Sequence, residues 1–156
     1  KKVYSNAPKN EEGKAQIMDQ FCSELDQANW GVWLCDYNYN DDNSILWMTG
    51  NLVGGFSERF DEVRKWLFGT VSVLTKQPGE GGKGNIILRG AVVMRHATEG
   101  ANLLMKANPE AEYWTWTKVD VSTAEGKAKL TERWSKIYEG NVTSDGLHVY
   151  DAVEIK

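Results

Sequence analysis

The sequence predicts an α+β domain in which an antiparallel sheet of about five strands is flanked by helices. Some segments are apolar or alternating over strand length, and others repeat apolar residues at helical spacing. These segments mix strand pairs with helices and lack the regular β-α-β alternation of a parallel sheet. With 156 residues, 41% hydrophobic and 26% charged, the chain is expected to be one domain over residues 1–156 with a core of its own.

The first part of the chain is expected to contain a helix and a hairpin. Residues 1–10 are polar and predict an arm, and residues 11–28 carry apolar side chains at helical spacing, with Asn10 as the N-cap and Asn29 at the end. Residues 30–39 and 45–51 are rich in aromatic and apolar residues around a polar turn. They predict two paired strands.

A second helix is expected after this hairpin. It is predicted to open at Gly54 and Gly55, to run over residues 56–67 with Asp61 and Lys65 as an i,i+4 pair, and to stop at Gly69.

The second half of the chain predicts more strands and one clear helix. Residues 70–75 and 86–95 are apolar strands joined by a glycine-rich loop, residues 97–112 allow one helical turn, and residues 114–120 alternate like a strand. Ser122 and Glu125 form a capping box, which predicts a helix that ends at Gly140. Residues 147–156 predict an edge strand.

Charge and cysteine usage restrict the classes of partner and compartment. The net charge of −4 argues against nucleic acid as the main partner, because phosphate binding needs clustered basic residues. Cys22 and Cys35 predict two reduced, buried thiols rather than a disulfide. No apolar run reaches the ~18 residues of a membrane span and no signal peptide is visible, so a cytoplasmic location is expected. Seven Trp and six Tyr predict a core rich in large aromatic side chains.

No motif for catalysis, a cofactor or a metal is found. Residues 36–47 resemble a calcium loop, but Asp41 replaces the required Gly and Trp47 the required Glu. Gly82-Lys83 lacks the rest of a phosphate-binding loop. Neither His96 nor His148 has a Cys or second His at metal spacing. We therefore expect no enzyme activity, no cofactor and no metal.

Two alternatives remain open from the residues alone. Asp36, Asp61 and the tryptophans would supply a small hydrolase or transferase with an acidic and aromatic cleft. Exposed aromatic residues would allow RNA contact, which the acidic charge disfavours. Around residues 58–65, basic and acidic side chains alternate, and this segment is either a surface of ion pairs or an anchor for an acidic partner.

Several separate segments together resemble a known family. They are KVYSN at residues 2–6, NLVGGF at residues 51–56 with RF at 59–60, GAVVMR at residues 90–95 and WTKVD at residues 116–120. Their order and spacing are similar to those in the C-terminal domain of the gamma subunit of the translation elongation factor 1 complex. The resemblance implies an antiparallel sheet with flanking helices in a curved, lens-like module. It also implies a non-catalytic scaffold of the complex that exchanges guanine nucleotide on the tRNA-delivering GTPase.

The resemblance further implies partners and candidate binding residues. The partners are the other subunits of the complex, with aminoacyl-tRNA synthetases as further candidates. The matched positions are Asn51, Arg59, Arg95 and Trp116. Asn51 is also a candidate cap of the second helix. The two arginines would either meet a carboxylate or phosphate on a concave face or brace the fold.

This chain departs from the family pattern at several positions. Ser57 replaces a large residue, and His96 replaces a glycine. The departures indicate a divergent member.

Overall fold

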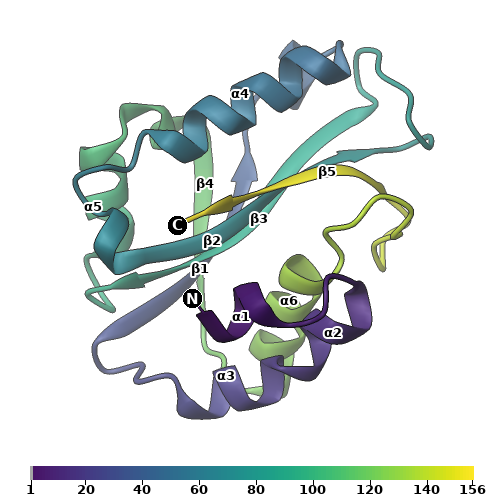
Figure 1. Cartoon of the computed structure of the whole chain (residues 1–156). Helices are drawn as coiled ribbons and strands as arrows, with labels where there is room; N and C mark the ends of the chain where they lie inside the picture. Colours follow the sequence, from purple (N-terminus) through teal and green to yellow (C-terminus); the bar gives the residue numbers. More distant parts are fainter. Residues whose placement is uncertain (1) are drawn as a thin grey trace.

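Five antiparallel strands form the centre of the structure, a computed structural model that describes residues 2–156 (Figure 1). Their spatial order is β4-β1-β3-β2-β5. The strands are β1 (Trp30–Tyr37), β2 (Leu67–Thr75), β3 (Ile86–Arg95), β4 (Trp114–Val119) and β5 (His148–Ile155). Each neighbouring pair is antiparallel. The α+β fold class and the five-stranded antiparallel sheet predicted from the sequence are confirmed.

Helices cover both faces of this sheet (Figure 1). Helices α4 and α5, with the 3-10 turn η3, pack on one face, and α1, α2, α3 and α6 lie on the other. The helices are α1 (Lys2–Asn6), α2 (Glu11–Gln16), α3 (Met18–Glu24), α4 (Leu46–Glu58), α5 (Gly100–Ala107) and α6 (Ala124–Ser135). The 3-10 turns are η1 (Asn40–Asp42), η2 (Arg64–Trp66) and η3 (Pro109–Tyr113). No helix in this described range is long and apolar enough to cross a membrane.

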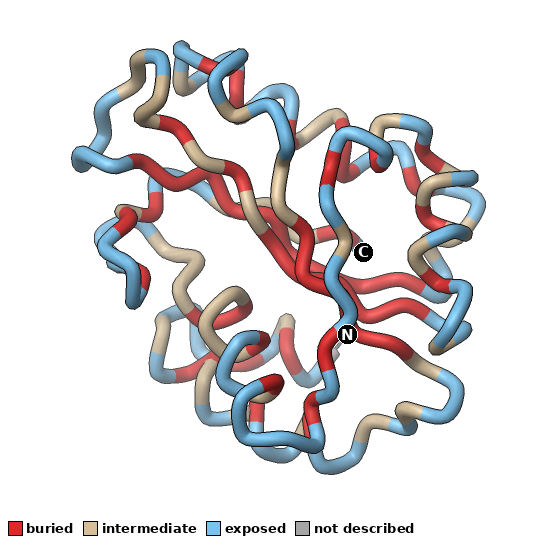
Figure 2. The backbone as a smooth tube through the Cα atoms, turned by 180° about the vertical axis from the view of Figure 1, so that it is seen from behind, coloured by how far each residue is buried: buried red, intermediate tan, exposed pale blue. Residues whose placement is uncertain are grey.

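The two-residue period of the strands divides the core between the two faces. In β1, Trp33 and Cys35 point into the cluster under α4 and α5, whereas Val32 and Leu34 point into the cluster under α1, α3 and α6. All nine residues of β2 are buried, and Figure 2 shows that most of the sheet's central part is buried. A strand that is covered on both faces is mostly apolar, which explains why the polar residues within β2 are only the small Thr70, Ser72 and Thr75.

The predicted hairpin of residues 30–39 and 45–51 is wrong. Strand β1 pairs with β3 and β4 instead, and residues 46–51 belong to α4. Within α4, Thr49, Val53 and Phe56 are buried at helical spacing, and Gly54 lies inside the helix rather than at its start. The outer side of α4 also carries apolar residues, so the segment resembles a buried strand in sequence.

The predicted helix over residues 56–67 is wrong as well. Helix α4 ends at Glu58, and Gly69 lies within β2, where it does not stop a helix. A Cβ atom at Gly69 would lie 2.5 Å from the carbonyl oxygen of Ala91, so close strand packing explains this glycine. Asp61 forms its ion pair with Arg64, at 3.0 Å, and not with Lys65.

Helix boundaries near both ends of the chain differ from the expectation. The helix expected over residues 11–28 is divided at Ile17 into α2 and α3 and ends at Glu24, well before Asn29. Asn10 is its cap as predicted, since its Oδ1 accepts a hydrogen bond of 2.7 Å from the Gly13 N–H. The expected arm at residues 1–10 instead contains α1, whose Tyr4 is buried in the core.

The capping box of Ser122 and Glu125 is wrong by one residue. The N-cap of α6 is Thr123, whose Oγ1 accepts a hydrogen bond of 3.0 Å from the Gly126 N–H. Ser122 instead donates from Oγ to Asp120, and α6 ends at Ser135, short of Gly140.

Other predictions are confirmed. The hairpin of β2 and β3, the strand β4 and the edge strand β5 form as expected, and α5 contains the expected helical turn. Cys22 and Cys35 are free and buried. Three tryptophans (Trp33, Trp114 and Trp134) lie in the core as expected.

Candidate functional site

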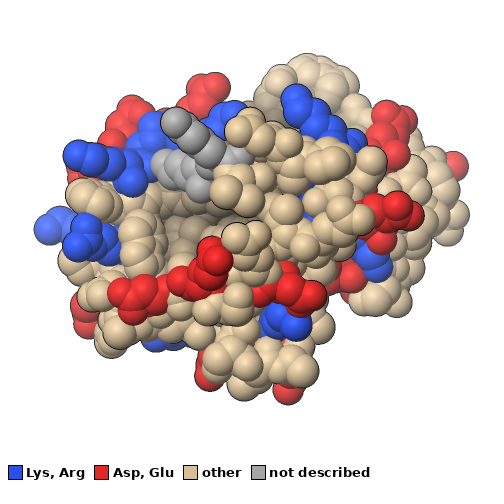
Figure 3. Space-filling model, turned by 60° about the horizontal axis from the view of Figure 1, so that its bottom comes forward, with Lys and Arg blue, Asp and Glu red and all other residues tan. Residues whose placement is uncertain are grey.

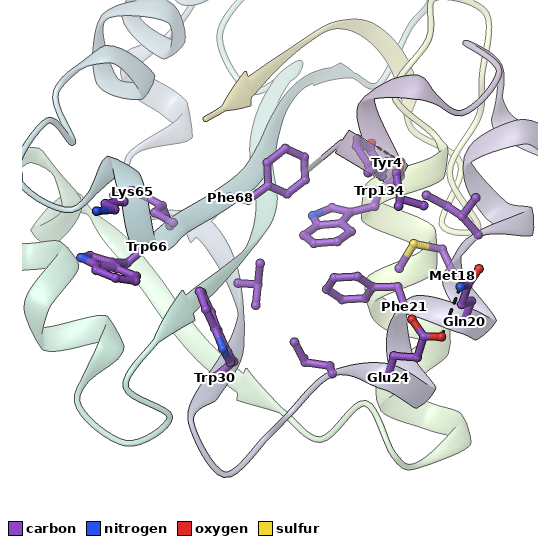
Figure 4. Close-up of a pocket in the computed structure, with 15 residues that line it drawn as sticks. Tyr4, Met18, Gln20, Phe21, Glu24, Trp30, Lys65, Trp66, Phe68 and Trp134 are labelled. Carbon is purple, nitrogen blue, oxygen red and sulfur yellow. Dashed lines mark hydrogen bonds between the residues drawn. The ribbon is translucent and has the colours of Figure 1, made fainter.

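A cavity of about 320 Å³ opens between helices α1 and α3 on one side and the ends of strands β1, β2 and β3 on the other (Figure 4). This apolar cavity lies on the sheet face that carries α6. Its volume falls at the lower end of the range of small-ligand pockets, which are mostly apolar with a few polar groups at the border. The cavity matches that description in size and lining.

Aromatic side chains from four elements build the inner wall of the apolar cavity. Ring centroids of Phe21 and Trp134 are 5.0 Å apart, those of Tyr4 and Phe68 are 5.2 Å apart, and those of Phe68 and Trp134 are 5.4 Å apart. Such edge-on and tilted contacts are favourable for aromatic rings.

The polar ends of these aromatic residues are satisfied within the protein. Trp134 Nε1 donates to the Ala91 carbonyl oxygen at 3.0 Å, and the Tyr4 hydroxyl donates to the Trp134 carbonyl oxygen at 2.5 Å. Burial raises the pKa of Tyr4 far above its usual value, so this hydroxyl keeps its proton. The wall is therefore held in place and presents apolar faces to the cavity.

The border of the apolar cavity on the sheet side is cationic. Trp66 is 37% exposed, and its ring centroid lies 4.7 Å from Arg95 Cζ and 5.3 Å from Lys65 Nζ. Within residues 2–156, neither Lys65 nor Arg95 has a carboxylate oxygen within 4.0 Å. Lys65 and Trp66 line the cavity, and Arg95 lies next to it through its contact with Trp66. We call these three residues the cationic border.

The border on the helix side is acidic and polar. Glu24 lines the cavity there, and its Oε1 accepts a hydrogen bond of 3.2 Å from Gln20 Nε2. In Figure 3 this side of the molecule shows a hollow with acidic side chains along one border and basic side chains beside another. The apolar cavity thus has opposite charges on its two sides.

The four predicted binding residues are not brought together in one site. Arg59 follows α4 and holds both carboxylate oxygens of Glu110, at 2.6 and 2.7 Å. Trp116 Nε1 donates to the Ala111 carbonyl oxygen at 2.8 Å. Both residues therefore contact the η3 segment. Of the four, only Arg95 lies near the apolar cavity: it does not line the cavity itself but contacts the lining residue Trp66. The binding role of all four remains a prediction.

Asn51 lies on a second surface, the outer face of α4, and does not cap a helix. This face carries Trp47 (65% exposed), Met48 (50%) and Leu52 (38%). No charged residue occurs from Leu46 to Ser57, and Cβ atoms added at Gly50 and Gly54 would meet nothing within 4 Å. We call Trp47, Met48, Gly50, Asn51, Leu52 and Gly54 the α4 face.

The two aspartates named for a hydrolytic cleft lie in separate ion pairs, whereas three of the tryptophans named with them line the apolar cavity. Asp36 contacts Arg133 at 3.1 Å, Asp61 contacts Arg64 at 3.0 Å, and neither lines the apolar cavity. In the part of the chain that the structure describes, no group of three or more His, Cys, Asp or Glu side chains is placed to hold a metal ion. Burial raises the pKa of the Cys35 thiol to about 12 and raises that of Cys22, so both thiols stay protonated at neutral pH.

The apolar cavity between α1, α3 and the sheet is not predicted by the sequence. Tyr4 lies in a segment expected to be a polar arm, and Trp30 and Trp66 are expected only in the aromatic core or, with the other tryptophans, in the alternative acidic and aromatic cleft. The available signal was the apolar pair Val3-Tyr4 inside the polar first ten residues, because an aromatic residue in such a segment needs a place to be buried.

Comparison with known proteins places the chain in a family. Residues 1–95 match the family model described as "Elongation factor 1 gamma, conserved domain". The chain is 33% identical over 152 residues to "Elongation factor 1-gamma 2" of Oryza sativa subsp. japonica, covering 97% of this chain and 33% of the relative. It is 33% identical over 149 residues to "Elongation factor 1-gamma" of Schizosaccharomyces pombe, covering 94% and 34%.

A more distant relative is "Elongation factor 1-gamma" of Drosophila melanogaster, 30% identical over 139 residues, covering 86% of this chain and 29% of the relative. The chain spans about a third of the length of these relatives. The family resemblance inferred from the four segments is confirmed. The chain belongs to the family of the elongation factor 1 gamma conserved domain.

Proposed function

We propose that the chain is a non-catalytic protein-interaction module of a translation elongation factor 1 complex in the cytoplasm. In this role it helps to hold together the assembly that supports guanine nucleotide exchange on the tRNA-delivering GTPase. Its partners would be other subunits of that complex, with aminoacyl-tRNA synthetases as further candidates. The names of the relatives support the complex, and the α4 face is the observation that supports protein binding.

The α4 face has the composition of a protein interface rather than that of a solvated helix surface. A helix at the surface of a protein normally presents charged and polar residues to water, whereas α4 presents Trp47, Met48 and Leu52 and has no charged residue before Glu58. Contiguous exposed apolar residues mark interaction surfaces, and aromatic residues and Met are enriched there. The open glycines allow a partner backbone to approach closely.

The proposal is tested with the full-length subunit and the purified other subunits of the complex. Trp47→Ala combined with Met48→Ala should weaken binding about tenfold or more if these residues act as interface anchors. Val142→Ala is the matched control, because Val142 is also an exposed apolar residue, at 43%. Circular dichroism checks that all variants fold. If the double variant and the control bind every subunit as tightly as the unmodified protein, the α4 face is not the interface.

A further inference from the structure

We infer that the apolar cavity is a second binding site, separate from the α4 face, for a short segment of a partner protein. The segment inserts an aromatic or long aliphatic side chain into the cavity and places an acidic residue against the cationic border. This inference does not depend on the α4 face, because the two surfaces lie on opposite faces of the sheet.

The cavity wall fits an apolar side chain. The lining includes Trp30, Phe68 and Trp134, and the wall rings are held by mutual contacts and by the hydrogen bonds of Tyr4 and Trp134. A pocket that is already formed needs little reorganisation before it binds, which favours affinity. An inserted apolar group gains stabilisation in proportion to the apolar area that it removes from water.

The cationic border selects the charge of the neighbouring residue. Arg95 lies over the Trp66 ring, and an arginine in such a stacked arrangement can still donate from its edge to both oxygens of a carboxylate. Lys65 adds a second cation beside the same ring. Because neither cation has a carboxylate partner within residues 2–156, an external acidic group would meet two uncompensated charges.

The helix-side border sets the orientation of the segment. Glu24 lies across the cavity from the cationic border and repels an acidic residue placed near it. The chain as a whole is also acidic, with a net charge of −4. An acidic segment is therefore attracted locally at Lys65 and Arg95 and disfavoured elsewhere, which gives specificity more than affinity.

The test uses capped pentapeptides of the form Asp-Asp-X-Asp-Asp, in which X is Trp, Phe, Leu or Met. Matched peptides carry Ser at X, or Lys in place of every Asp. Binding is followed by two-dimensional NMR of isotopically labelled protein, with the indole N–H signals of Trp30 and Trp66 as reporters. We expect saturable shifts at these two indoles for at least one apolar, acidic peptide. The Ser and Lys peptides should bind about tenfold more weakly or not at all.

Variants identify the site. Trp66→Ala and Lys65→Glu should each weaken the best peptide, whereas Trp47→Ala on the α4 face and Lys76→Glu in the β2–β3 loop serve as matched controls and should leave its affinity unchanged. Raising the salt concentration should weaken the acidic peptide, because the border is exposed and screened.

Three results would overturn the inference. They are no saturable shift with any acidic peptide, equal affinity for the Asp and Lys peptides, or shifts that survive Trp66→Ala. Two free acids, indole-3-propionate and decanoate, form a separate arm. If these bind at Trp30 and Trp66 and the peptides do not, the cavity is a site for small amphipathic acids and the inferred protein segment is wrong.

Discussion

The buried thiol of Cys35 should make the stability of this protein fall at alkaline pH. Cys35 lies in the central part of β1, opposite Gly90 of β3 and Trp116 of β4, and it is fully buried. Removal from water is the main reason why its pKa rises from the ordinary 9.0 to about 12, and the nearby positive charge of Arg133 offsets only part of that effect.

The direction and size of the effect follow from proton binding. Between pH 9 and 12 the unfolded chain releases the Cys35 proton and the folded protein keeps it, so rising pH favours unfolding. The stabilisation is complete below pH 9 and is lost progressively above it. At pH 10 an exposed thiol with a pKa of 9.0 is mostly ionised and the buried thiol is almost entirely protonated, which lowers the free energy of unfolding by about 1 kcal/mol.

The assay is urea unfolding of the unmodified protein and of Cys35→Ala, at pH 7 and pH 10, with a reductant present. Loss of packing in the variant is independent of pH, and the tyrosines titrate in both proteins, so both effects cancel in the comparison. The unmodified protein should lose about 1 kcal/mol more than the variant between the two pH values. Equal losses would refute the reasoning, since Cys35 would then ionise in the folded state.

Three further changes test the local structure. Thr123→Ala should lower the free energy of unfolding by about 1 kcal/mol in thermal or urea unfolding, because it removes the N-cap of α6. Ser122→Ala should lower it clearly less. If Ser122→Ala has the larger effect, the capping box of Ser122 and Glu125 is correct after all. His96→Gly should stabilise the protein by about 0.5–1 kcal/mol, because His96 has φ +70° and glycine adopts that conformation without steric cost. An unchanged or lower stability of the variant would show that the backbone at His96 is not strained. A double-mutant cycle of Arg59→Ala and Glu110→Ala should give a coupling free energy of about 0.2–1 kcal/mol that decreases in 1 M salt, because this ion pair is exposed. A larger coupling free energy that does not change with salt would contradict this expectation.

The strain at His96 also gives a physical meaning to one departure from the family pattern. The resemblance implies a glycine where this chain has His96, and His96 adopts a left-handed backbone with φ +70°. Histidine tolerates that conformation better than most residues but at some cost. The left-handed backbone is therefore the physical reason why glycine suits this position.

The α4 segment shows where reasoning from the sequence failed. A short apolar run is compatible with a buried strand and with a helix that is apolar on both sides, and periodicity separates the two only when the outer face is polar. In α4 the outer face is apolar as well. The apolar outer face of α4 therefore explains the wrong strand prediction and also supports an interaction surface.

The cavity depends on contacts between residues far apart in the chain. Tyr4 donates to the backbone of Trp134, and Trp66 stacks with Arg95. Spacing along a sequence carries no information on such pairs, because they are set by strand order and by which helices cover which face. Arg95 is a binding residue implied by the resemblance, and Lys65 belongs to the segment over residues 58–65 that is a candidate anchor for an acidic partner, but the sequence does not show that Trp66 joins them.

The sequence by itself determined the fold class, the β2–β3 hairpin, the strands β4 and β5, the aromatic core and the family. These features rest on local periodicity, turn composition and the order of motifs, which are properties of neighbouring residues. The tertiary structure decided the strand order β4-β1-β3-β2-β5, the helical state of residues 46–58 and the existence of the apolar cavity. Those features depend on burial against distant segments, whose contribution to stability exceeds the small differences in local propensity.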